Sequence, residues 1–160
     1  MDQYEISLRK LTRDPRIRRM KQYQQHTISN TFDHVCHVAR MSRKIQKKLR
    51  LSLSEAELLR GAMLHDYYLY NFRENPIGPY AHGTSHAQIA AENADRDFHL
   101  TEKEKQIILS HMWPLNLTRI PRCREAWVVT AADKICAFQE MILHRHFDED
   151  LHEDSDITAL

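Results

Sequence analysis

Hydrophobic residues recur at intervals of three and four along most of the chain, and no segment alternates apolar and polar residues with a period of two. The first spacing places apolar side chains on one face of a helix, whereas alternation would indicate a half-buried strand. The pattern therefore predicts an all-α fold, a compact single-domain helical bundle. The expected helices cover about residues 4–12, 15–23, 31–49, 52–68, 84–98, 101–113 and 122–143.

Capping residues, prolines and glycines indicate where these helices begin and end. Ser29 or Asn30 is expected to cap the third helix, because such side chains accept hydrogen bonds from the free N–H groups of the first turn. Capping boxes are expected at Ser52–Glu55 and Thr101–Glu104. Residues 69–83 contain two of the three glycines and two prolines, so they are predicted to form a loop.

The length of 160 residues fits one domain. Charge is distributed unevenly: residues 1–60 carry 14 Lys and Arg against 6 Asp and Glu, whereas residues 146–160 carry 6 acidic and no basic residues. We expect basic helices in residues 1–25 packed on the core, a main domain in 26–143 and an acidic tail in 144–160. The basic region suits an anionic partner, but a solvated helical face explains it as well. Nucleic acid is therefore a possible partner that is not favoured, and the oligomeric state stays open.

Several features favour the cytoplasm. The three cysteines show no CxxC spacing and indicate reduced thiols. The first residues lack the pattern of a signal peptide, and no apolar stretch approaches the length of a membrane span. We therefore expect a cytoplasmic protein without a membrane partner.

Eleven histidines are the most unusual feature of the composition. Composition alone does not separate metal ligands from surface residues, but helical phase does. On the helix predicted over 31–49, His34 borders the apolar stripe that contains Val38 and Met41. His37 aligns instead with charged residues and is expected to be exposed.

Five further polar residues lie on apolar faces of the predicted helices. They are the adjacent pair His65–Asp66, and His86, His111 and Asp133. A buried, unpaired carboxylate is very costly, so Asp66 must meet a cation or a dense network of hydrogen bonds. Four inward histidines and two inward aspartates together favour a site for a transition metal, with Mn, Fe, Co, Ni and Zn as the candidates.

The order of these residues resembles that of a known family. His34 in DHVCHVA, the pair His65–Asp66 in AMLHDYYLY and Asp133 in TAADKICA resemble the H…HD…D signature of the HD-domain superfamily of metal-dependent phosphohydrolases. His86 and His111 fall where the two-metal branches of that superfamily carry extra histidines. The resemblance covers about residues 26–140.

The resemblance implies a ligand set. One divalent metal would be held by His34, His65, Asp66 and Asp133, and a second by His86 and His111, with Asp66 bridging the two. His82 lies four residues before His86 and is either a competing ligand or a residue that lines the pocket.

The resemblance also implies the chemistry, which is hydrolysis of a phosphate ester by a metal-activated water. The expected substrate is a small phosphomonoester, a phosphodiester or a nucleotide. Asp66 and Lys134 are the expected catalytic residues, with Lys134 stabilising charge on the phosphoryl oxygens. Arg73, His82 and His26 are expected to bind substrate.

Two alternative functions stay open on the sequence alone. HD-type folds with the same six ligands include di-iron oxygenases, which differ from hydrolases in their metal and in their use of oxygen. The second alternative is a non-catalytic module that binds nucleotide or RNA.

Overall fold

The computed structural model describes residues 2–23, 30–71 and 78–142, with side chains described for 85–140 in the last range. This part of the chain folds into helices and contains no strand. The helices are α1 (Gln3–Thr12), α2 (Pro15–Arg18), the short 3₁₀ helix η1 (Arg19–Gln22), α3 (Thr31–Lys48), α4 (Glu55–Leu64), α5 (Gly78–Phe98), α6 (Glu102–Ser110) and α7 (Arg124–Ile142). The prediction of an all-α helical bundle is confirmed.

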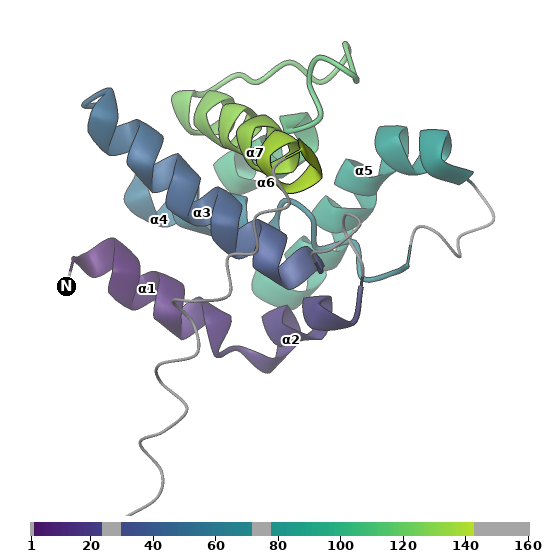
Figure 1. Cartoon of the computed structure of the whole chain (residues 1–160), viewed down its shortest axis with the longest axis horizontal. Coiled ribbons are helices and arrows are strands. Elements are labelled where there is room, and N and C mark those ends of the chain that lie inside the picture. The colour runs from purple at the N-terminus through teal and green to yellow at the C-terminus, as the bar shows by residue number, and fades with distance from the viewer. Residues whose placement is uncertain (1, 24–29, 72–77, 143–160) are drawn as a thin grey trace, which may run out of the picture.

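α3 is the central helix of the bundle (Figure 1). It packs against α4 on one side and α7 on the other, and α6 packs against α4, α5 and α7. The apolar stripe read from the sequence is buried over its first part: Val35 and Val38 of α3 are fully inaccessible to solvent. Met41 is partly buried, and Leu49, at the end of the stripe, is exposed. The hydrophobic effect across these helix faces holds the fold together.

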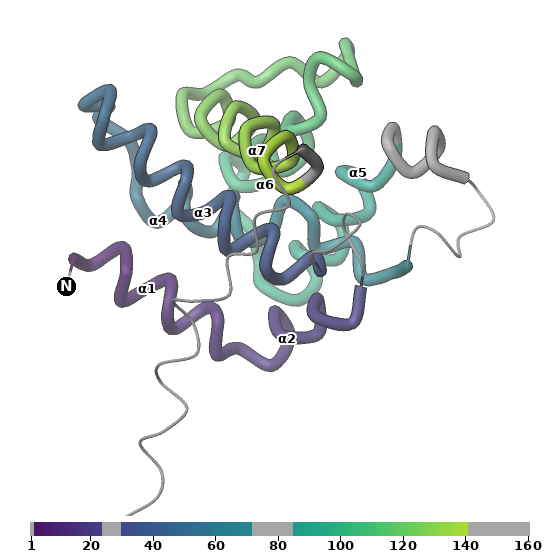
Figure 2. The backbone as a smooth tube through the Cα atoms, viewed as in Figure 1, coloured from purple at the N-terminus to yellow at the C-terminus, as the bar shows by residue number. Residues whose placement is uncertain are grey.

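The N-terminal helices lie against this bundle, at the bottom of the view (Figure 2). Tyr4 and Leu8 of α1, Ile17 of α2 and Met20 of η1 are buried in the common core. The Tyr4 hydroxyl donates a hydrogen bond to the Ala39 carbonyl of α3 over 2.8 Å.

Helix boundaries agree with the capping signals in some places. Asn30 caps α3 by accepting from the Asp33 N–H at 2.9 Å. Thr101 and Glu104 form the predicted capping box at the start of α6. The box predicted at Ser52–Glu55 is wrong, because Ser54 is the N-cap of α4 and the Glu55 carboxylate pairs with Arg43 instead.

Three other boundaries differ from the expected ones. α4 ends at Leu64 and α6 at Ser110, several residues before the predicted ends, so that His65 and His111 become C-cap residues. α5 begins at Gly78, within the segment predicted to be a loop. Proline is tolerated in the first turn of a helix, where its missing N–H would have no partner, so Pro79 does not prevent this early start.

α3 ends in a Schellman motif without glycine. The Leu51 N–H donates to the Gln46 carbonyl at 3.0 Å and the Arg50 N–H to the Lys47 carbonyl at 3.2 Å. Arg50 takes the left-handed conformation that glycine usually supplies there, with φ 52°. Because the chain has only three glycines, a non-glycine residue takes the left-handed conformation at the end of this helix.

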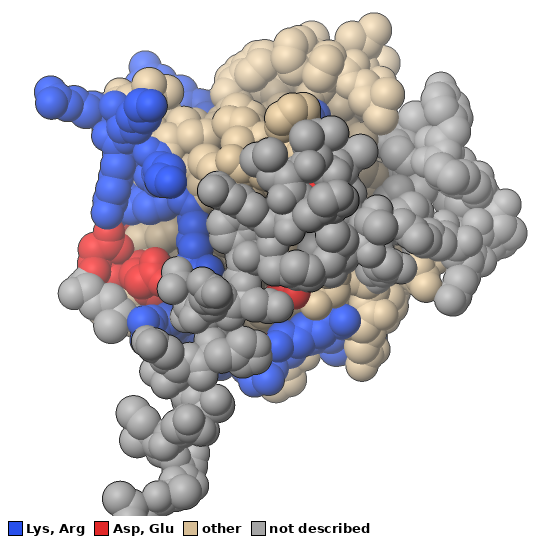
Figure 3. Space-filling view, viewed as in Figure 1, with Lys and Arg blue, Asp and Glu red and all other residues tan. Residues whose placement is uncertain are grey.

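The surface divides by charge. Lys44, Lys47, Lys48 and Arg50 are exposed at the C-terminal end of α3. Basic side chains gather at the upper left of the view, where this end of α3 lies (Figure 3). Over α7 most of the visible surface is uncharged (Figure 3). Within the described part of the chain, no helix is both long enough and apolar enough to span a membrane.

Candidate metal centre

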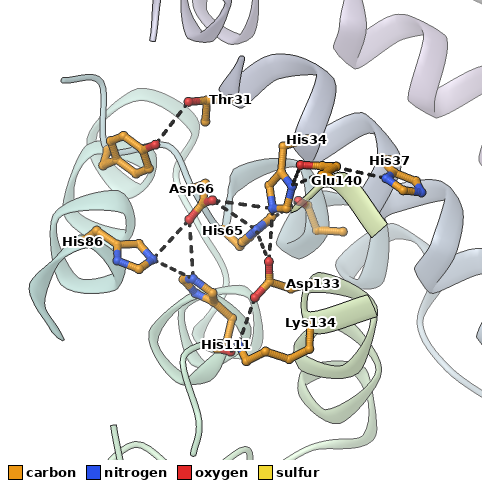
Figure 4. Close-up of polar contacts among 12 residues, drawn as sticks. Thr31, His34, His37, His65, Asp66, His86, His111, Asp133, Lys134 and Glu140 are labelled. Carbon is orange, nitrogen blue, oxygen red and sulfur yellow. Dashed lines mark hydrogen bonds and ion pairs between the residues drawn. The ribbon is translucent and has the colours of Figure 1, made fainter. Parts of the chain in front are cut away.

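The six side chains predicted as metal ligands all lie together in the interior. His34 comes from the first turns of α3, His65 and Asp66 from the turn after α4, His86 from α5, His111 from the end of α6 and Asp133 from α7 (Figure 4). Their exposed fractions range from 0% for His34 and His65 to 7% for Asp133. Five elements that are distant in sequence therefore present ligating atoms to one buried volume.

His65 and His111 are held in place by the same device. Each residue is the C-cap of its helix, and its Nδ1–H donates to the carbonyl three residues earlier, Ala62 or Ile108, at 2.7 Å. The last carbonyls of a helix have no partner within the helix, so they are free to accept. Because Nδ1 carries the proton in both rings, a neutral ring presents the lone pair of Nε2 to the interior.

Asp66 lies between two groups of histidines (Figure 4). Its Oδ2 is 3.5 Å from His65 Nε2 and 3.8 Å from His34 Nε2. Its Oδ1 is 3.3 Å from His86 Nε2 and 3.5 Å from His111 Nε2. The two oxygens of one carboxylate thus face two separate groups, which is the arrangement of a bridging ligand.

Asp133 completes the first group. Its Oδ1 is 3.1 Å from His34 Nε2 and 3.6 Å from His65 Nε2. Its Oδ2 accepts from Lys134 Nζ at 2.9 Å, and the same ammonium group donates to the His111 carbonyl at 2.8 Å. Lys134 therefore connects Asp133 on α7 to the end of α6.

The electrostatics of the centre favour a cation. Burial alone would raise the pKa of Asp66, but the imidazoles of His65, His111 and His86 outweigh it, and the pKa lies well below its usual range. The pKa of Asp133 is also well below its usual range, because the nearby imidazoles of His34 and His65 outweigh burial. Burial lowers the pKa of His111 to about 4, so this ring is neutral near pH 7.

His34 is the charged histidine of the group. Burial opposes its protonation, but hydrogen bonds to Asp133 and Glu140 outweigh burial and raise its pKa to about 10. The His34 imidazolium and the Lys134 ammonium both pair with Asp133. A buried negative charge is stable only when it is paired or bound to a metal.

The donor atoms fit bound transition-metal ions. His65 Nε2 is buried and makes no hydrogen bond, although two carboxylate oxygens lie within 3.6 Å. A lone pair that faces carboxylate oxygens is repelled by them unless a cation lies between. Two ligands that are each about 2.1 Å from one ion lie at most about 4.2 Å apart, and the Nε2–carboxylate distances meet this limit. Two overlapping groups, His34–His65–Asp133 and His65–Asp66–His111, have donor atoms within 4.8 Å of one another.

The surrounding helices add to this preference. α4 and α6 both point their C-terminal ends at the centre, because His65 and His111 are the C-cap residues of these helices. The C-terminal end of a helix carries partial negative charge and stabilises a nearby cation. Imidazole and carboxylate together are ligands typical of Mn, Fe, Co, Ni and Zn.

One residue of the centre was missed in the sequence, and one was placed on the wrong side. Glu140 of α7 accepts from His34 Nδ1 at 3.0 Å and from His37 Nδ1 at 3.2 Å. Its spacing of seven residues from Asp133, two helical turns, could have indicated it. His37, which was expected to be exposed, is 6% exposed, because α7 packs along α3 and widens the buried face of that helix.

Three predicted substrate residues lie outside the described residues. Arg73 and His26 fall in 72–77 and 24–29, and the side chain of His82 belongs to a part of α5 whose side chains are not described. Lys134 is described and adjoins the centre through Asp133. Its role on substrate stays a prediction.

Comparison with known proteins supplies the family. A family model for the HD domain matches residues 31–137, which is more than half of the chain and includes all six of the converging histidines and aspartates. The chain has no match among curated proteins and none among solved structures. Because this match covers more than half of the chain and includes the ordered histidines and aspartates, the chain belongs to the HD-domain family, within the superfamily of metal-dependent phosphohydrolases.

Proposed function

We propose that this protein is a metal-dependent phosphohydrolase that cleaves a small phosphate ester, either a phosphomonoester or a phosphodiester such as a nucleotide. The observation that carries the proposal is the position of Asp66, whose two oxygens face two groups of imidazoles. A pair of divalent ions bridged by one carboxylate is a common arrangement for hydrolysis at phosphorus. The proposed ligands of the first ion are His34, His65, Asp66 and Asp133, and those of the second are Asp66, His86 and His111.

Ions bound at these residues would polarise the phosphoryl oxygens and lower the pKa of a bound water, which then serves as the nucleophile. The protein's own groups hold that arrangement in place. The Ala62 and Ile108 carbonyls fix the rings of His65 and His111, so that Nε2 of each faces the centre. Ligands oriented before substrate binds need no rearrangement during the reaction.

Lys134 has two roles in the proposal. Its ammonium group orients the Asp133 carboxylate and fixes the turn after α6, through contacts of 2.9 and 2.8 Å. These contacts use two of its three N–H donors. Its side chain is 42% exposed, and the third donor is the one proposed to bind a phosphoryl oxygen of the substrate.

The decisive variant is Asp66→Asn, which keeps the size of the side chain and removes its charge. Loss of a residue that only hydrogen-bonds a metal ligand typically lowers metal affinity or activity about 10–100-fold. Asp66 would itself be a ligand, so we expect metal content and turnover to fall by more than that. Purified protein is loaded with Mn²⁺, Fe²⁺, Co²⁺, Ni²⁺ or Zn²⁺, its metal content is measured, and p-nitrophenyl phosphate, bis-p-nitrophenyl phosphate and nucleotides are offered. Asp95→Asn is the matched control, because Asp95 lies on α5 and pairs with Lys105 at the surface.

Two outcomes would overturn the proposal. Full metal content and turnover in Asp66→Asn would exclude the bridging role. Iron-loaded protein that consumes oxygen without hydrolysing any phosphate ester would identify the centre as an oxygenase instead.

A further inference from the structure

Glu140 is a buried carboxylate to which the proposed function assigns no part. It lies on α7 two residues before the helix ends, and 8% of it is exposed. Both of its oxygens lie within hydrogen-bond distance of His34 Nδ1, at 3.0 and 3.1 Å. Oε1 is also 3.2 Å from His37 Nδ1, so the carboxylate lies between two histidines of α3 (Figure 4).

The position of Glu140 in its helix is unfavourable for stability. The C-terminal end of a helix carries partial negative charge, so an acidic residue in the last turn is repelled. Burial adds the cost of removing a carboxylate from water. An apolar residue of similar size would avoid both costs, which indicates that the carboxylate has a role beyond packing.

His34 needs a side-chain partner that His65 and His111 do not need. Those two residues close the C-terminal ends of helices, where free backbone carbonyls accept from Nδ1–H. His34 lies in the first turns of α3, where the unpaired backbone groups are N–H donors and not carbonyls. Glu140 supplies the acceptor that the backbone cannot supply at this end of a helix.

We propose that Glu140 is a positioning residue for the first metal ion: it holds the Nδ1–H of His34, so that Nε2 presents its lone pair to the ion. His37 holds the same carboxylate from the other side and fixes its orientation. This inference rests on the proposed metal centre and adds a carboxylate–histidine–metal connection to it. Such a partner fixes the tautomer of the ring and makes it a stronger ligand, and its loss typically lowers metal affinity about 10–100-fold.

The test compares the affinity of full-length variants for Co²⁺ and Zn²⁺ at one pH, with no substrate present. Glu140→Gln removes the charge at nearly constant volume, and we expect it to weaken binding of both ions about 10–100-fold. Glu140→Asp keeps a carboxylate and is expected to recover part of the affinity. The visible spectrum of bound Co²⁺ should change in Glu140→Gln, because the geometry of the His34 ligand changes.

Glu125→Gln is the matched control. Glu125 is another buried glutamate of α7, and its carboxylate accepts from the Ser54 N–H at 2.9 Å and pairs with Lys103 at the far end of the helix. Its loss should lower the free energy of unfolding without changing metal affinity. In ¹⁵N-histidine spectra of the Zn²⁺-loaded protein, this control should keep the His34 signals of the wild type, with the proton on Nδ1 and the ion on Nε2.

The outcomes separate this inference from the proposed function. Wild-type protein that binds neither ion would overturn both. Wild-type protein that binds, together with equal affinity and an unchanged Co²⁺ spectrum in Glu140→Gln, would overturn the role of Glu140 and leave the metal centre in place. Should Glu140→Gln not fold, Glu140→Asp and His37→Gln decide: both must weaken binding, and unchanged affinity in both would overturn the inference.

Discussion

At the scale of single residues, the centre is organised by the proton on each imidazole. His65 and His111 donate from Nδ1 to backbone carbonyls, and His34 donates from Nδ1 to Glu140. All three rings therefore direct Nε2 toward the two aspartates. The positions of these histidines around the predicted helices indicated that they point inward. The partner of each Nδ1 depends instead on where the helices end and on what packs beside them.

The pKa of His34 leads to a prediction about metal binding. In the metal-free protein hydrogen bonds to Asp133 and Glu140 outweigh burial and raise this pKa to about 10, so both ring nitrogens carry protons near pH 7. The protonated ring stabilises the metal-free fold fully below about pH 6.5, the unfolded value, and this contribution is lost as the pH rises through about 10. An ion must displace the Nε2 proton, so its affinity should change in the opposite direction and increase with pH.

We expect about one proton to be released per ion at the first site, and hence an affinity that rises about tenfold from pH 7 to pH 8. Calorimetric titration with Zn²⁺ in two buffers of different ionisation enthalpy measures the number of protons directly. Binding that releases no proton over this range would contradict the assignment of His34 as a ligand.

At the scale of elements, the contact between α4 and α6 sets the distance between two ligands. Gly61 of α4 faces the Ile107 side chain of α6, and a Cβ on Gly61 would lie 2.6 Å from Ile107 Cγ2 and 3.1 Å from its Cβ. Rotation about χ1 would move Cγ2 but not Cβ, and a β-branched residue in a helix strongly prefers one χ1 rotamer. His65 and His111 end these same helices, so the close approach of the helices also brings the two rings together, 4.8 Å apart between centroids.

Gly61→Ala should therefore destabilise the protein although alanine is the better helix former. Overpacking costs about 1–3 kcal/mol, against a gain of about 1 kcal/mol from helix propensity. We expect a lower free energy of unfolding in urea and a weaker affinity for Zn²⁺. The control is Ala56→Gly at an exposed position of α4, which loses only the propensity and should leave metal affinity unchanged. A Gly61→Ala protein that is more stable and binds Zn²⁺ normally would refute this account of the α4–α6 contact.

At the scale of the whole molecule, the N-terminal helices share the core of the matched family region. The family match begins at residue 31, yet Tyr4, Leu8, Ile17 and Met20 are buried in the same cluster as α3 and α4. The predicted division into residues 1–25, 26–143 and 144–160 stays a prediction. Shared burial leads us to expect that the described N-terminal helices unfold together with the rest of the bundle.

Leu8→Ala tests this expectation. Leu8 is 1% exposed, so the substitution should cost about 2–5 kcal/mol and lower Tm by roughly 5–15 °C. Trp113 and Trp127 are more than 100 residues away from Leu8 in the sequence, and their rings contact each other. Their fluorescence should report the same shift in Tm as circular dichroism. Ile6→Ala is the control, since Ile6 is 47% exposed. Tryptophan fluorescence that melts at the wild-type temperature in Leu8→Ala would show that α1 unfolds independently.

The sequence by itself determined the helical class, the cap at Thr101 and which six side chains point inward, and it narrowed the cap of α3 to Ser29 or Asn30. Helical periodicity and local capping are properties of short segments, so the sequence carries them directly. It placed the end of α4 beyond His65, because no local signal marked that boundary. It placed the start of α5 too late, because the glycines and prolines of residues 69–83 indicated a loop. Only the tertiary structure decided that Asp66 faces two groups of imidazoles and that Glu140 lies between His34 and His37. These relations join residues that are up to 106 positions apart, and their geometry is set by the packing of α3 against α4 and α7.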